Sequence, residues 1–221
     1  MDNADEKWQW VDEDPIEKLL HARQSPAATF RAEGHAQFQR GCFVEAADSF
    51  RRALQDNPGH ADALAGLGSC LLHLDASEEA LSCFNRLLET EGGYEPALLG
   101  TAVALQKLAR YEEAGRIYRE LLQINPDSAE TLSNLIALSV ARQDGAAVSE
   151  YADRLLRIEP QSKAALQGLA MLAMRGGDRA AATEYCTRLV EVDPDSFEGW
   201  ANLRHAQQRT RPPGEAARSI A

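Results

Sequence analysis

The chain has 221 residues and a formal net charge of −11, and 44% of its residues are hydrophobic. This apolar content is sufficient for a packed core and excludes global disorder. The negative charge argues against nucleic acid and anionic membranes as the main partners. The sequence contains no run of about 18 apolar residues, so we expect no membrane insertion.

The N-terminal segment, residues 1–26, is acidic and contains Trp8 and Trp10. Within it, Asp14 followed by Pro15 predicts the start of a short helix, because aspartate caps helices and proline suits the first helical position. Three interpretations of this segment stay open. It caps the first repeat, it lies in the protein's own binding groove, or it is a separate docking motif.

From residue 27 the sequence repeats with a period of 34 residues and without insertion or deletion. A repeat of this length with two apolar-periodic stretches is typical of a helix-turn-helix solenoid. The expected repeats are 27–60, 61–94, 95–128, 129–162 and 163–196.

Each recurring position has a physical reason. Position 20 is small, as in Ala46, where we expect the two helices of a hairpin to cross closely. Position 32 is proline in four repeats, as in Pro58, and proline ends a helix because it cannot continue the hydrogen-bond ladder. Glycine or polar residues such as Gly41, Asp75 and Gly177 predict the inner turns.

These repeats resemble the tetratricopeptide-repeat (TPR) family over residues 27–196. The matching signature residues are Gly34, Ala46, Phe50, Ala53 and Pro58 in the first repeat, Leu64, Leu67, Gly68, Ala80 and Phe84 in the second, and Ala102, Tyr111, Ala114, Tyr118 and Pro126 in the third. The resemblance implies an all-α fold, a right-handed superhelical solenoid of five TPR hairpins. Departures at Val148, Ala152 and Cys186 predict looser packing in the fourth repeat, and Gly92 in place of proline predicts a shifted angle after the second.

The sequence after the repeats begins a further first helix. We expect a C-terminal capping helix over residues 197–211, with Trp200 and Leu203 in packing positions, because an array must close its open end. Residues 212–221 begin with Pro-Pro-Gly, which predicts a flexible tail.

The resemblance also implies that the first helix of each repeat lines a concave groove that binds a partner. The predicted groove residues are Arg31, His35, Gly66, Ser69, Leu72, His73, Leu99, Gly100, Val103, Lys107, Asn134, Val140, Gly168, Met171, Arg175 and Asn202.

Three features of this set have alternative explanations. The glycines at position 6, such as Gly66, either leave room for a ligand or reflect drift on an exposed face. Asn134 and Asn202 either hold a peptide backbone, as asparagine does in the family, or are solvated surface amides. The apolar residues, such as Leu72 and Met171, either form an apolar groove for an amphipathic helix or are partly buried between helices.

We find no constellation for catalysis, a metal or a cofactor. The run from Gly66 to Ser69 lacks the lysine of a phosphate loop, and Cys70 with His73 is only half of a metal site. The four cysteines have no CxxC spacing, and the N-terminus has no basic start with an apolar run. We therefore expect reduced thiols and a cytoplasmic location.

The sequence predicts a non-enzymatic protein–protein interaction scaffold, such as an adaptor, assembly factor or chaperone. Its partner would be another protein, bound as an amphipathic helix or an extended peptide, and not nucleic acid. Two alternatives stay open. One is a structural protein that assembles into a homo-oligomer, and the other is the regulatory subunit of a separate enzyme.

Overall fold

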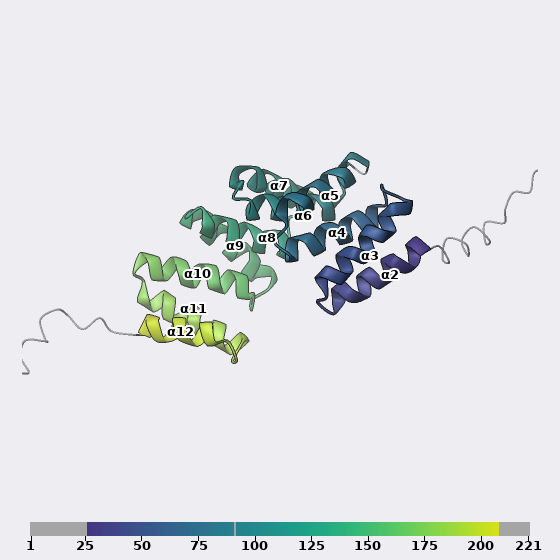
Figure 1. Ribbon diagram of the computed structural model, residues 1–221. Helices are drawn as coiled ribbons and strands as arrows, with labels where there is room; N and C mark the ends of the chain where they lie inside the picture. Colours follow the sequence, from purple (N-terminus) through teal and green to yellow (C-terminus); the bar gives the residue numbers. More distant parts are fainter. Residues whose placement is uncertain (1–25, 91, 208–221) are drawn as a thin grey trace, which may run out of the picture. The chain divides into compact units, whose positions relative to one another are not determined.

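The computed structural model describes residues 26–90 and 92–207, and every regular element in this part of the chain is an α-helix (Figure 1). The predicted short helix after Asp14 and the predicted tail lie outside the described residues. The fold is an all-α solenoid of repeats, and none of the described helices is both long and apolar enough to cross a bilayer.

The chain divides into two compact units, Met1–Leu108 and Ala109–Ala221. The helices of the first unit are α2 (Pro26–Gln39), α3 (Phe43–Asp56), α4 (Ala61–His73), α5 (Ser77–Thr90) and α6 (Glu95–Lys107). Those of the second are α7 (Tyr111–Ile124), α8 (Ala129–Ala141), α9 (Gly145–Ile158), α10 (Lys163–Gly176), α11 (Arg179–Val192) and α12 (Phe197–Gln207).

The helix boundaries follow the sequence period. Helices α4, α6, α8, α10 and α12 each begin 34 residues after the previous one, and α3, α5, α7, α9 and α11 do the same. Within each unit, contacts join the two helices of a hairpin and the helices of neighbouring hairpins.

The inner turns of the hairpins share one backbone conformation. The amide of Ala76 donates to the carbonyl of Leu71 at 2.9 Å, and the amide of Asp75 donates to Leu72 at 3.4 Å. This is the Schellman arrangement, in which a left-handed residue ends a helix. The residues with positive φ at this place are Gly41, Asp75, Ala109, Gln143 and Gly177, so the predicted turns are confirmed.

An aromatic ring of the second helix packs against glycines of two first helices. A Cβ atom added at Gly66 would lie 2.4 Å from Cζ of Phe50, and one added at Gly34 would lie 3.0 Å from the same atom. Gly100 would meet the ring of Phe84 at the same 2.4 Å. The glycines at position 6 are therefore required by packing, which replaces both explanations offered from the sequence.

In the fourth hairpin the large and small partners exchange places. Ala152 occupies the position that Phe50 and Phe84 occupy in the first two hairpins. Ile136 occupies a position that is glycine or alanine in the other four repeats. A Cβ at Gly168 would lie 2.7 Å from Cγ2 of this isoleucine. Both Ile136 and Ala152 are buried, and Ile136 contacts the glycine at the position that a ring contacts in the first two hairpins.

Arginines of second helices bind the carbonyl of the proline that closes the preceding hairpin. Nη2 of Arg86 donates a hydrogen bond to the carbonyl oxygen of Pro58 at 2.6 Å. The other two pairs, Arg154 to Pro126 and Arg188 to Pro160, have a distance of 2.9 Å. In the third repeat the corresponding residues are Glu120 and Gly92.

The terminal helix α12 packs differently from the expectation. Leu203 and Ala206 are buried, and the helix contacts α11. Trp200, which the sequence placed in a packing position, is 52% exposed. Its indole Nε1 instead donates to the carbonyl of Pro194 at 2.8 Å.

Three of the four thiols are buried and one is exposed. Burial raises the pKa of the Cys70 thiol to about 11, and it also raises the pKa of Cys83 and Cys186 above their ordinary values. Cys42, in the first inner turn, is exposed. Because the thiolate is the reactive form, burial and protonation both protect the three core cysteines.

We expect one fast-reacting thiol in the native protein. With a chromogenic disulfide reagent at pH 8, Cys42 should react at least about 100-fold faster than the three buried thiols, whose thiolate fraction is small. Cys42→Ser should remove the fast phase, and all four thiols should react in denaturant. Two or more fast thiols in the native chain would contradict the burial described here.

A second prediction concerns the ring-to-glycine contact. Gly66→Ala should lower the free energy of unfolding by about 1–2 kcal/mol, because overpacking against Phe50 exceeds the intrinsic helix preference of alanine. Gly176→Ala is the matched control, because a Cβ there meets no atom within 4 Å. This control should be neutral or stabilising by up to about 1 kcal/mol.

Urea denaturation followed by circular dichroism measures both changes. Phe50→Leu combined with Gly66→Ala should lose less stability than the sum of the two single changes, since the smaller side chain accommodates the new methyl group. Additive losses would show that the two residues are not coupled.

Candidate functional site

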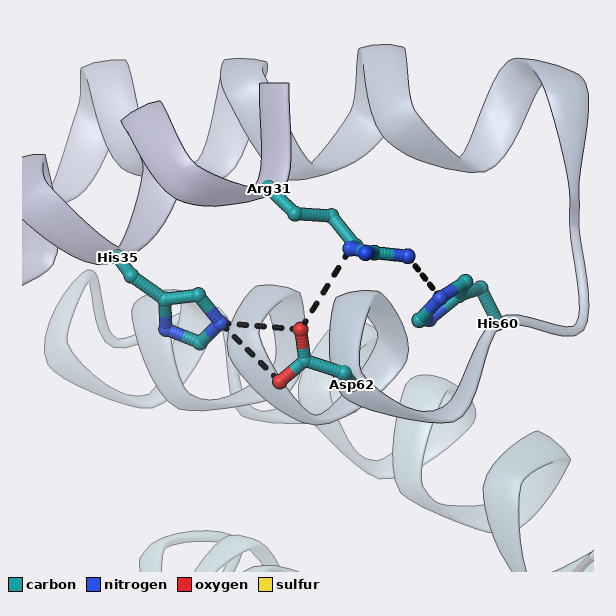
Figure 2. Close-up of polar contacts among 4 residues, drawn as sticks. All are labelled: Arg31, His35, His60 and Asp62. Carbon is teal, nitrogen blue, oxygen red and sulfur yellow. Dashed lines mark hydrogen bonds and ion pairs between the residues drawn. The ribbon is translucent and has the colours of Figure 1, made fainter. Parts of the chain in front are cut away.

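Two predicted groove residues of α2, Arg31 and His35, lie over the start of α4 (Figure 2). Nε2 of His35 is 3.0 Å from one carboxylate oxygen of Asp62 and 3.1 Å from the other. Nε of Arg31 is 3.7 Å from the same carboxylate, and its Nη1 donates a hydrogen bond to Nε2 of His60. Both side chains therefore join the first helix pair to the second.

Two more predicted groove residues of the first unit contact the preceding helix pair. Nζ of Lys107 lies 2.5 Å from Oδ1 of Asp75, and this hydrogen bond and charge lower the pKa of that carboxyl below its ordinary value. The His73 ring stacks on Phe43, with ring centroids 4.1 Å apart, and Phe38 meets both rings edge-on. These aromatic side chains fill the end of the first helix pair.

The remaining groove residues of the first unit are mostly covered. Leu72, Leu99 and Val103 are half-buried, and Leu72 packs against the core of the unit. Ser69 is half-buried as well, and Gly100 is buried. For Leu72 the structure therefore favours partial burial between helices over an open apolar groove.

Four predicted groove residues of the second unit lie together around a pocket of about 260 Å³. They come from α8 and α10 and are Val140, Gly168, Met171 and Arg175. The pocket is also lined by residues outside the predicted groove set, namely Ser139, Gln143, Gly145, Val148, Leu172 and Gly176.

The pocket combines apolar walls with one cation. Val140, Val148 and Leu172 form its walls, and Met171 is 42% exposed. Nη2 of Arg175 donates to Oε1 of Gln143 at 3.1 Å. Because an amide is neutral, this contact leaves the positive charge of the guanidinium available to a ligand.

A comparison of equivalent positions explains why this pocket is open. Phe43 is the first residue of α3. The second helices of later hairpins begin at intervals of 34 residues, so the equivalent residue in α9 is Gly145. Likewise Arg175 corresponds to His73. Where the rings of Phe43 and His73 stack in the first unit, the corresponding place in the second unit has no ring. Glycine at this one position was the sequence signal for the pocket.

The two predicted groove asparagines lie outside this pocket. Asn134 on α8 and Asn202 on α12 are both half-buried. Among the described residues no side chain or backbone group forms a hydrogen bond with either amide. An amide of this kind retains its full capacity to donate to and accept from a peptide backbone.

The acidic residues at the start of α7 are engaged in ion pairs. Arg110 donates to both carboxylate oxygens of Glu113 at 2.7 and 2.8 Å, which lowers the pKa of that carboxyl. Glu112 lies 2.8 Å from the guanidinium of Arg142. Within residues 26–90 and 92–207, no group of three His, Cys, Asp or Glu side chains is placed to bind a metal.

The fold is shared with solved TPR structures. TTC0263, a thermophilic TPR protein of Thermus thermophilus, is 19% identical with a TM-score of 0.68, over 81% of this chain and 98% of that one. PilF of Pseudomonas aeruginosa is 20% identical with a TM-score of 0.68, over 84% and 90%. YrrB, described as a TPR protein with an unusual peptide-binding site, is 14% identical with a TM-score of 0.61, over 86% and 98%.

No curated protein matches the sequence. Two family models described as tetratricopeptide repeat do match it, one at residues 37–100 and the other at residues 96–128 and 164–196. Together the matched residues make up more than half of the 221-residue chain. The TPR fold serves generally as a non-enzymatic scaffold for protein–protein interaction. The chain belongs to the tetratricopeptide-repeat family.

Proposed function

We propose that this protein is a cytoplasmic adaptor, assembly factor or chaperone that holds a segment of another protein against α8 and α10. The observation that carries the proposal is the pocket at Val140, Gly168, Met171 and Arg175, where residues predicted from the first helices lie together. The YrrB structure is described as having a peptide-binding site, which supports a similar use of the fold here.

The size of the pocket favours one side chain of a larger partner. Its volume of about 260 Å³ is below the roughly 300–1,000 Å³ typical of small-molecule sites. Met171 provides a flexible apolar surface that adapts to different shapes. We therefore propose that a large apolar residue of an amphipathic helix or an extended peptide inserts here.

Arg175 defines the second requirement on the partner. Its unneutralised guanidinium would bind a carboxylate close to the inserted apolar residue, and arginine binds carboxylates with two parallel hydrogen bonds. Asn134, on the same first-helix series, would hold the peptide backbone. The first unit is the weaker candidate, because Arg31, His35, His73 and Lys107 already contact neighbouring helices.

Two substitutions should weaken partner binding by different routes. Met171→Glu replaces the apolar side chain and places a carboxylate beside Arg175, where it neutralises the guanidinium that the partner would bind. Gly145→Phe places a ring at the position equivalent to Phe43, where the added Cβ would lie 2.8 Å from Cδ1 of Leu172, so the bulky side chain obstructs the pocket. Each should weaken binding of the captured partner by about 10- to 100-fold, the range of a lost apolar anchor.

The measurement is affinity capture from the native host, followed by calorimetric titration of the captured segment. Ala180→Glu is the matched control, since it adds one negative charge at an exposed position on α11. It should bind like the parent chain. If the same partners bind Met171→Glu and Gly145→Phe with unchanged affinity, the pocket is not the binding site. Fractionation of the host tests the cytoplasmic location.

A further inference from the structure

Helix α12 presents an uncovered stripe of aromatic and basic residues. Phe197 is 88% exposed, the largest value among the large apolar side chains in the described part of the chain, and Trp200 is 52% exposed. We call this stripe the α12 patch. Its residues have the spacing of one helix face, and they line a shallow hollow: Phe197, Trp200, Ala201, Arg204 and His205.

The α12 patch is a separate face from the one that packs on α11. Leu203 and Ala206, on the packed face of the helix, are buried, whereas Arg204 and His205 in the α12 patch are exposed. The hydrogen bond from Trp200 to Pro194 holds the indole in one orientation. The helix thus has an aromatic end and a basic end on its open side. Exposed apolar patches next to polar residues mark interaction sites.

Charge distinguishes this end of the chain from the rest. The chain carries a net −11, yet residues 204–221 carry four arginines and one glutamate, a net of +3. Residues 1–26 carry seven acids and three Lys/Arg, a net of −4. Trp8 and Trp10 lie in the middle of these acids, so this segment has the aromatic character and the opposite charge that the α12 patch would bind.

We propose that the α12 patch binds residues 5–13 of a second copy of this chain. The indoles would cover Phe197 and Trp200, and Asp12 and Glu13 would face Arg204 and His205. Each aromatic side chain removes roughly 150–250 Å² from water, and the complementary charges set the direction of the contact.

In this proposal the segment belongs to a second copy of the chain. If the segment of the same chain covered the α12 patch instead, the mass in solution would not change with concentration. A contact between different surfaces of two copies is heterologous. Such contacts propagate into open chains of molecules unless a rotation closes them into a ring.

The test is the mass of the full chain in solution. Sedimentation velocity in reductant, from about 1 to 300 µM, should give a weight-average mass that rises with concentration at low salt. At about 0.5 M salt, where charges are screened within a few ångströms, the mass should fall toward that of the monomer.

Blocked variants make the test specific. Trp8→Ala/Trp10→Ala removes the donor, and Arg204→Glu reverses the charge of the acceptor, so each alone should stay monomeric. Mixed in equal amounts, they retain one intact donor and one intact acceptor. The mixture should therefore form a dimer and nothing larger. Asp12→Lys/Glu13→Lys should restore assembly to the Arg204→Glu chain.

Two controls separate this contact from other effects. Arg157→Glu makes the same charge change at an exposed position on α9 and should assemble like the parent. Met171→Glu should also assemble normally, so failure of the proposed groove and failure of this contact are distinguishable. A parent chain that stays monomeric at every concentration would overturn the proposal, as would a mixture of the blocked variants that forms no dimer.

Discussion

The packing of one aromatic ring against two glycines is the contact on which the repeat arrangement depends. Phe50 touches Gly34 of its own hairpin and Gly66 of the next, and Phe84 meets Gly100 in the same way. A ring held on both sides cannot move without opening two helix interfaces. The exposed ion pairs and the arginine-to-proline hydrogen bonds add directional contacts to this arrangement, but surface pairs alone contribute little stability.

The same constraint explains where the molecule has space for a ligand. Volume must be conserved where helices pack, so Ile136 fills the place left by Ala152. At Gly145 the side chain of Leu172 approaches the glycine, since an added Cβ would lie 2.8 Å from its Cδ1, and both residues line the pocket. In the first unit the rings of Phe43 and His73 occupy the corresponding place. The second unit is therefore better suited to accept a side chain from another protein.

Two segments that flank the repeats, residues 1–26 and residues 204–221, carry opposite net charge. A terminal helix usually turns a polar face to water. Helix α12 instead exposes Phe197 and Trp200 next to arginine, while the acids and two tryptophans precede α2. The pocket and the α12 patch use different residues of the second unit. One surface could hold a foreign partner while the other joins copies of the chain, which is how a scaffold multiplies weak contacts.

The sequence by itself determined the family, the all-α class and the positions of the inner turns, because a 34-residue period, closing prolines and turn residues are local signals. It also placed Val140, Gly168, Met171 and Arg175 on one face. Only the tertiary structure decided which of the predicted groove residues surround a cavity, because that depends on residues elsewhere in the chain, such as Gly145 and Leu172. The same limit applied to Arg31 and His35, whose polar atoms meet a neighbouring helix, and to the glycines at position 6. The role of these glycines is packing, and the side chain that requires it lies in the preceding repeat.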